Sequence, residues 1–393
     1  MHHRRNWPDA AWHFDFEVPA SLSDRYGELV SIAGTVSLDT QGKLRAPNDL
    51  DSQLALVMAE LDMIVNGAGV NLDSVAKLVA FYVDSPPNAR DRVINAMRQK
   101  FPLDVGPALS AIPVDNLAFP GMMLEIEGYA LADLDGMPLA RSAPALGTLK
   151  SGDWLFIDTR ACRVDGGGAL QTQAGNAADK LQTALLANQS SLSDVVRLNV
   201  YYNSNGGNND LTSVAQALAE RFEQPGPVVT FVPLPTLAQT EQWVEIDAIA
   251  MPGAKRETPS GGEPQHLPGW SWPSDWPFVQ SLRCGDAIFI GGQCAFDEQR
   301  NIINPGDMES QTRQVMDRIV GLLAAYGATY DDVMKVGCWY NGGASVEVLK
   351  RNALIRTSYM TKPGATSTGV PVRTCFATGS EIQIDVVAMT EER

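Results

Sequence analysis

Three similar strand-like segments place a proton-carrying side chain, or its amide analogue, at one recurring position. Glu125 lies in LEIEGYAL, Glu245 in VEIDAIAM and Gln383 in IQIDVVAM. A carboxyl group can donate a proton to a reacting nitrogen or orient an attacking water, whereas an amide cannot take a proton from water at neutral pH. Gln383 therefore cannot serve as a general base. On the residues alone, a solvated carboxylate facing outward from a strand is the simpler interpretation of Glu125 and Glu245.

A second set of strand-like segments recurs at a constant distance before these positions. VAKLVAFYVDS, VVRLNVYYNSN and VMKVGCWYNGG each contain a tyrosine, with a basic residue five positions before it. An acidic residue follows each tyrosine after 45 residues; the pairs are Tyr82 with Glu127, Tyr202 with Asp247, and Tyr340 with Asp385. Because chance would not repeat this interval three times, the sequence predicts three tandem copies of one module.

The remaining elements of each copy complete a small α+β module. Residues 28–39, 153–164 and 286–297 are rich in β-branched and aromatic side chains, which predicts a strand leading into a hairpin. Apolar residues at helical spacing follow Asp49 in the first copy and Asp307 in the third, and Asp49 is a suitable N-cap. A second helix is predicted before the last strands, which gives the order strand, strand, helix, strand, helix, strand.

Such a module has helices on only one face of its sheet, so a neighbour must cover the other face. Three copies in one chain therefore predict sheets that surround a shared core, an intrachain pseudo-trimer. We assign residues 1–136 to module 1 with an N-terminal extension, 137–255 to a divergent module 2, and 256–393 to a linker plus module 3. The tryptophans of the extension and linker are interpreted as docking these segments onto the modules.

Composition limits the classes of partner. The chain has 46 Asp plus Glu against 30 Lys plus Arg, and its net charge of −16 would repel nucleic acid. The sequence contains no apolar run of about 18 residues, so no membrane span is predicted. Its five cysteines include no CxxC pair, which fits a cytoplasmic protein. Four histidines, three of them in the first 13 residues, predict no metal site, and no cofactor is indicated. We expect a small-molecule substrate and a monomeric pseudo-trimer, with or without further self-association.

The third copy carries a family resemblance most fully. PFVQSLRCGDAIFIGGQCAFD, ESQTRQVMDRIVGLLAAYGATYDDVMKV and IQIDVVAM, taken in order, resemble the Rid family, also called the YjgF or L-PSP family. The resemblance implies a chorismate-mutase-like α+β fold. Members are usually homotrimers with a small-molecule pocket at each subunit interface, so this chain resembles such a trimer fused into one polypeptide.

The resemblance also shows where the chain departs from the family. Well-known members hydrolyse 2-imino acids to 2-oxo acids and ammonia, and a signature arginine holds the substrate carboxylate. In the corresponding stretches GPALSAIPV, GPVVTFVPL and PGATSTGVP no arginine is present. Depending on a one-residue choice of alignment, that column holds Leu109, Val229 and Ser367, or Ser110, Thr230 and Thr368. A hydroxyl cannot replace the planar cation without losing the charge pairing.

The candidate site residues follow from this comparison. The resemblance assigns the acid–base role to Glu125 and Glu245, and Arg160 occupies a column that lines the family pocket, where the third copy has Gln293. Arg160 could replace the missing arginine from another wall, unless it is a surface residue paired with a carboxylate. The other binding candidates are Arg373, Phe278, and the hydroxyl column Ser110, Thr230 and Thr368, for which ordinary β-propensity is the alternative.

The sequence thus predicts a hydrolase or deaminase acting on a small enamine, imine or related C–N bond. By family analogy the setting would be the catabolism of a nitrogen-containing aromatic or heterocycle. The alternative is a non-catalytic protein of the same fold that binds a small metabolite. A third activity sometimes attributed to the family, ribonuclease, is disfavoured by the net charge of −16 and by modules without histidine.

Overall fold

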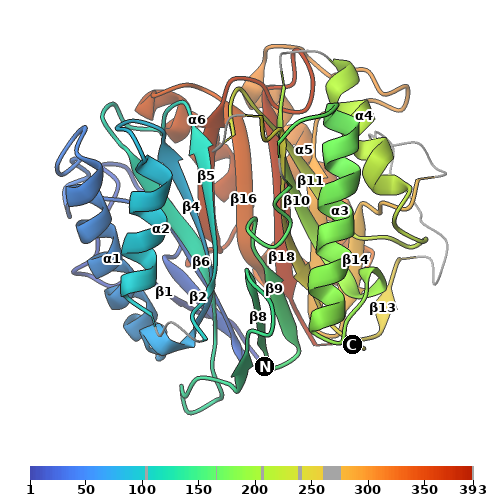
Figure 1. The fold of residues 1–393 in the computed structure, drawn as a ribbon. Helices are drawn as coiled ribbons and strands as arrows, with labels where there is room; N and C mark the ends of the chain where they lie inside the picture. The colour runs from blue at the N-terminus through green and yellow to red at the C-terminus, as the bar shows by residue number, and fades with distance from the viewer. Residues whose placement is uncertain (102–104, 165, 205–207, 238–240, 260–275, 392–393) are drawn as a thin grey trace.

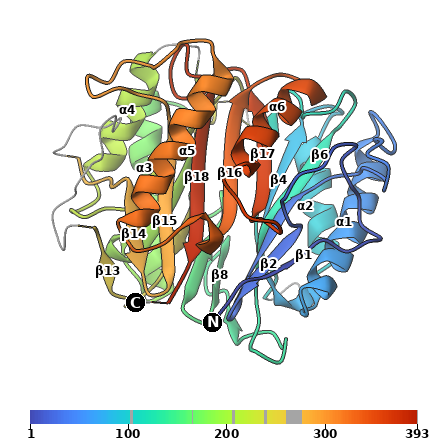
Figure 2. The same cartoon turned by 180° about the vertical axis from the view of Figure 1, so that it is seen from behind.

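A computed structural model describes residues 1–101, 105–164, 166–204, 208–237, 241–259 and 276–391. Three six-stranded sheets stand around a common axis, with helices on the outside (Figures 1 and 2). Within the described residues, no helix combines the length and apolar character needed to cross a membrane.

The first sheet is built from module 1 and has the strand order β1-β2-β3-β6-β4-β5. Its strands are β1 (Arg4–Asn6), β2 (Ser23–Tyr26), β3 (Leu29–Thr35), β4 (Val75–Val83), β5 (Ala108–Val114) and β6 (Leu124–Leu131). Helices α1 (Leu50–Gly67) and α2 (Ala89–Gln99) cover its outer face. The Asp49 side chain accepts a hydrogen bond from Ser52 N at 3.1 Å, so the expected N-cap of α1 is present.

The other two sheets repeat this order as β7-β8-β9-β12-β10-β11 and β13-β14-β15-β18-β16-β17. The second module comprises β7 (Arg141–Ser142), β8 (Thr148–Ser151), β9 (Trp154–Ile157), α3 (Leu170–Ala187), β10 (Val195–Asn203), α4 (Asn208–Ala219), β11 (Val228–Leu234) and β12 (Val244–Ala250). The third comprises β13 (Arg256–Glu257), β14 (Ser281–Cys284), β15 (Ala287–Gln293), α5 (Met308–Ala324), β16 (Val333–Asn341), α6 (Val346–Thr357), β17 (Thr366–Val372) and β18 (Ile382–Met389). The predicted fold, three α+β modules forming a pseudo-trimer, is confirmed.

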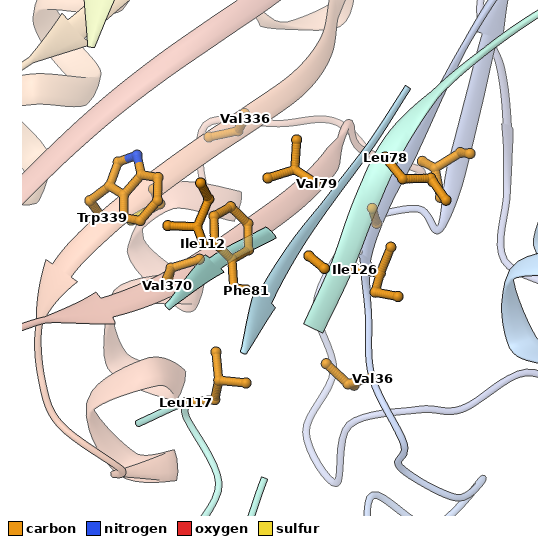
Figure 3. Packing of buried hydrophobic residues seen from close by; sticks show 14 of the residues in the cluster. Val36, Leu78, Val79, Phe81, Ile112, Leu117, Ile126, Val336, Trp339 and Val370 are labelled. Atoms are coloured by element: carbon orange, nitrogen blue, oxygen red, sulfur yellow. The ribbon is translucent and has the colours of Figure 1, made fainter. Parts of the chain in front are cut away.

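The inner faces of the sheets meet in a core at the pseudo-threefold axis. Phe81, Tyr201 and Trp339 precede the three recurring tyrosines, and Trp339 contacts the other two: its ring centroid lies 5.3 Å from that of Phe81 and 6.0 Å from that of Tyr201. Figure 3 shows part of this core, with Val79, Phe81 and Ile112 of module 1 beside Val336, Trp339 and Val370 of module 3. Each sheet thereby covers the apolar face that its neighbours leave open.

Three ion pairs, which we call the central ring, lie in this interior and each joins two modules. They are Lys77–Asp247 at 2.5 Å, Arg197–Asp385 at 2.5 Å and Lys335–Glu127 at 3.1 Å. Their members are the basic residues before the recurring tyrosines and the acids 45 residues after those tyrosines. Every one of these side chains is at most 13 % exposed. A buried charge that loses its partner is strongly unfavourable, so the ring fixes which module faces which.

Replacing one member of the ring tests its role. Lys335→Met leaves Glu127 buried without its cation and should lower the free energy of unfolding by about 3 kcal/mol or more. Chemical denaturation followed by circular dichroism measures the change, with Lys180→Met on the exposed side of α3 as the control. A loss within about 0.5 kcal/mol of that control would contradict the role of the ring.

Candidate functional site

Neighbouring modules meet where the outer strand of one sheet lies against the next sheet. Strand β17 packs on β3 at interface 3/1, and β11 packs on β15 at interface 2/3. At interface 1/2, the backbone N–H of Leu109 in β5 donates to Asp158 Oδ2 at 2.7 Å. The chain therefore has three related interfaces, each with its own side chains.

Interface 3/1 contains a narrow cavity that opens to solvent. Strands β3, β6 and β17, helix α6 and residues 7–22 of the N-terminal extension form its walls. Most of the lining is apolar or aromatic. The charged residues in the lining are Glu125 from β6 and Arg356 from α6, and Ser367 of β17 lies with them.

Arg356 is a buried cation, only 2 % exposed. Its Nη1 donates to Ser367 Oγ and its Nε to Asn352 Oδ1, both at 2.7 Å. Among the residues that the structure describes, no carboxylate lies within 4.0 Å of this guanidinium. Because an unpaired buried charge is costly, the site favours an anion bound beside it.

Sequence analysis missed Arg356, although a signal for it existed. Ser367 occupies the column in which the family carries its arginine, and α6 brings a guanidinium to that column from the neighbouring helix. Arg356 follows Tyr340 by 16 residues, and Arg98 follows Tyr82 by the same interval. The recurrence of this interval in the first and third copies marks the basic position in the sequence.

Glu125 is held mainly in its protonated form at neutral pH. Burial and the nearby Glu127 raise the pKa of Glu125 to about 8, against the opposing effects of Lys335, Arg356 and the backbone N–H of Gly369. The carboxyl packs directly on Gly34, where an added Cβ would meet Glu125 Oε1 at 1.9 Å. Only glycine fits this approach. A protonated carboxyl in a cavity can act as a general acid.

At interface 1/2 the corresponding groups are not brought together. Glu245 is completely buried, with Arg90 Nη2 3.7 Å from its Oε1, and burial raises its pKa. The cavity at this interface is lined by Arg98 and Arg160 but not by Glu245. Arg160 Nε donates to both oxygens of Asp158, at 3.1 and 3.0 Å, so the charge of this candidate is already neutralised within the protein.

Interface 2/3 has uncharged side chains at the same positions. Gln383 replaces the carboxyl and is 1 % exposed, and Leu218 stands where Arg98 and Arg356 stand in the other modules. Gln293 is buried and donates to Gly291 O at 2.9 Å. Phe278 is buried among aromatic rings, with the Phe231 centroid at 6.0 Å. At these two positions, interface 2/3 therefore has neither the acid nor the cation.

The other candidate residues lie away from the cavity of interface 3/1. Ser110 Oγ donates to Asp247 at 2.7 Å and Thr230 Oγ1 to Asp385 at 3.4 Å, so these hydroxyls contact the central ring. Thr368 lines the axial space with Glu127 and Lys335. Arg373 is 68 % exposed and binds Asp115 at the surface between modules 3 and 1, with Nη2 2.9 Å from Oδ1.

In the described part of the chain, no cluster of His, Cys, Asp and Glu could hold a metal ion.

Comparison with known families agrees with this arrangement. The sequence model of the family described as Endoribonuclease L-PSP matches residues 20–132 and 272–390, which is more than half of the chain. The chain belongs to the L-PSP family. This is the Rid family of the sequence analysis, and the middle copy lies outside the matched residues.

Individual relatives match parts of the L-PSP chain. A RutC family protein of Pyrococcus horikoshii is 40 % identical over 60 residues, which are 15 % of this chain and 48 % of the relative. One of Sulfurisphaera tokodaii is 37 % identical over 57 residues, 14 % of this chain and 46 % of the relative. The chain thus spans about half the length of the curated relatives it matches.

Among solved structures, one is similar in fold over most of this chain. A chorismatase crystal structure is similar with a TM-score of 0.54 at 11 % identity, covering 80 % of this chain and 93 % of the chorismatase. A putative endoribonuclease from Thermotoga maritima, 24 % identical, covers 30 % of this chain and 89 % of its own, with a TM-score of 0.27. At 11 % identity, the chorismatase likeness shows a shared fold alone.

The raised pKa of Glu125 predicts a pH-dependent stability. Because the folded pKa of about 8 exceeds the unfolded value of about 4.3, wild-type stability should fall as pH rises between these values. Glu125→Gln removes that loss. Its stability relative to wild type should therefore increase by more than about 1 kcal/mol from pH 5 to pH 8, measured by urea denaturation.

The exposed Glu298→Gln is the matched control and should follow the wild-type pH profile. If Glu125→Gln also follows the wild-type profile, Glu125 is not protonated in the folded protein at neutral pH.

Proposed function

We propose that this L-PSP chain hydrolyses a small anionic imine or enamine and releases ammonia at interface 3/1. The observation that carries the proposal is that two groups line the same cavity. One is the Glu125 carboxyl, whose pKa is about 8, and the other is the buried Arg356 guanidinium, which has no ionic partner among the described residues. A carboxyl of this kind supplies the proton, and the guanidinium supplies an anchor. In the family that the chain resembles, an arginine holds the substrate carboxylate and an acid positions or activates the attacking water, and this cavity offers a candidate for each role.

Arg356 binds the substrate carboxylate. Asn352 and Ser367 hold its Nε and Nη1, which fixes the plane of the guanidinium and leaves the Nη2 edge for the substrate. A cation fixed by hydrogen bonds loses little freedom on binding, so the carboxylate sets the position of the reacting carbon.

Glu125 transfers protons at the C=N bond. The protonated carboxyl donates to the imine nitrogen, which makes the carbon electrophilic, and water adds to that carbon. The resulting Glu125 carboxylate accepts the proton of the added water. The proton then passes to the amino nitrogen, and as the C–N bond breaks the hydroxyl group of the intermediate returns its proton to the Glu125 carboxylate. The products are one ammonia and one oxo compound for each imine and water consumed, and Glu125 is protonated again. An enamine that takes a proton on carbon gives the same protonated imine, to which water then adds.

The other two interfaces support this choice of site. Glu245 is completely buried outside the cavity at interface 1/2, and interface 2/3 has Gln383 in place of the acid. RNA cleavage, to which the family description refers, is not proposed because a chain with a net charge of −16 repels phosphate backbones. The five cysteines, all unpaired, fit a reaction in the cytoplasm.

Ammonia release from 2-iminopropanoate generated in situ tests the assignment. Glu125→Gln removes the general acid and should lower kcat at least about 100-fold. Glu245→Gln makes the same change at the corresponding strand position of module 2, outside this cavity, and as the matched control it should stay within about threefold of wild type. Equal losses in both variants, or a loss only in Glu245→Gln, would contradict the assignment to interface 3/1.

Arg356→Gln tests the anchor separately. Removing a charge-assisted contact to the carboxylate should lower kcat/KM about 10- to 100-fold. Arg98→Gln, the same change at the corresponding helix position of module 1, should leave kcat/KM near wild type. Arg356-dependent binding of carboxylates by a wild-type protein that shows no turnover would instead support the non-catalytic binding function.

A further inference from the structure

The N-terminal extension forms a wall of the cavity at interface 3/1 that interface 1/2 lacks in the described part of the chain. Residues 7–22, which we call the strap, connect β1 to β2, whereas the corresponding connection between β7 and β8 is only residues 143–147. Trp7, Trp12 and Phe14 of the strap line the cavity of interface 3/1. The short connection at interface 1/2 contributes no aromatic side chain to its cavity.

The strap belongs to module 1 and is hydrogen-bonded to module 3. Ser21 N donates to Ala365 O at 3.3 Å, and the backbone N–H of Gly364 donates to Pro19 O. Just before the strap, Arg5 Nη2 donates to Val333 O at 2.7 Å. These bonds join the first 22 residues to module 3. The strap is therefore held in place as a wall of the cavity.

The aromatic rings of the strap are ordered by contacts with one another. The Trp12 centroid lies 5.2 Å from Trp7 and 5.0 Å from Phe14, both edge to face. Phe14 is nearly parallel to Phe119 of module 1, with centroids 6.5 Å apart. Rings fixed in this way offer flat faces and edges to a ligand, and another flat ring gains more from them than a puckered one does.

Trp12 adds a hydrogen-bond donor, its indole N–H, to this wall. The side chain is 3 % exposed, and its Nε1 has no hydrogen-bond partner among the groups that the structure describes. The Trp7 Nε1, in contrast, donates to Trp12 O at 2.8 Å, as expected for a residue that only docks the segment. A buried N–H without an acceptor is unfavourable, and an acceptor on a ligand would satisfy it.

We infer that the strap makes this cavity selective for a carboxylate carried on a flat unsaturated ring with a hydrogen-bond acceptor. The carboxylate binds Arg356, the ring packs against the strap aromatics, and the acceptor takes the Trp12 N–H. The inference rests on the proposed function in one respect, because Arg356 is the anchor in both. It adds the class of substrate: a cyclic, conjugated carboxylic acid rather than a short aliphatic one.

Calorimetric titration of the full chain with substrate-like acids tests ring selection without requiring turnover. Benzoate and cyclohexanecarboxylate have the same carboxylate and ring size but differ in flatness. Benzoate should bind about tenfold more tightly to wild type, and Phe14→Leu should reduce this preference to about twofold. Equal affinities for wild type would overturn ring selection, while a loss of both affinities in Arg356→Gln would show that the anchor of the proposed function still holds.

The Trp12 contact is tested with 2-, 3- and 4-pyridinecarboxylate. At least one isomer should bind about tenfold more tightly than benzoate, and Trp12→Phe, which keeps a flat ring, should abolish that advantage. Trp243→Phe, at a tryptophan that is 37 % exposed in module 2, is the control and should change nothing. A pyridine advantage that survives Trp12→Phe, or is absent from wild type, would overturn the role of the indole N–H. Affinity that does not depend on Arg356 would overturn this inference and the proposed function together.

Discussion

The central ring of buried ion pairs is the interaction on which the rest of the structure depends. Each pair takes its base from one module and its acid from the next, so none can form within a single module. Burial makes an unpaired member unfavourable, and the three sheets are thereby held in one cyclic order. The cavity of interface 3/1 exists only in that order, because Glu125 and Arg356 come from different modules.

The ring also influences the reacting group. Glu127, its member in module 1, lies two residues from Glu125 on β6, and its charge raises the pKa of Glu125 while Lys335 opposes it. Burial acts to raise the pKa of Glu127 itself, but Lys335 and the Thr368 hydroxyl outweigh burial and lower it. Glu127 is thus kept ionised and Glu125 protonated. Neighbouring carboxyls with pKa values moved apart are typical of acid–base sites.

The fold was accessible from the sequence because repetition supplied three copies of the same evidence. The spacing of Lys335, Tyr340 and Asp385 recurs in the other modules, and it marks the strands that carry the central ring. The position of Glu125 recurs in the same way, but its interpretation as the acid came from the family resemblance. Alternation along β17 explains the open choice at the arginine column: Ser367 faces the cavity and Thr368 the axis, since adjacent strand residues point to opposite sides.

Other parts of the site depend on contacts between distant segments. The interval of 16 residues after the tyrosine marks Arg356 as a repeated basic position, but only the fold shows that α6 brings it into the cavity. Trp12 reaches the cavity from an extension outside the repeats. Arg160 occupied the expected column, but its pairing with Asp158 became evident only in the fold. Fusion of the modules allowed their interfaces to diverge, and the acid, the cation and the aromatic wall share one cavity at interface 3/1.

A crystal structure of the protein soaked with 4-bromobenzoate tests the location of the site most directly, because bromine gives an anomalous signal. We predict a single bromine peak in the cavity of interface 3/1, with the carboxylate within hydrogen-bond distance of Arg356. Bromine at Arg98 in interface 1/2, with the cavity beside Arg356 empty, would contradict the assignment of the functional site.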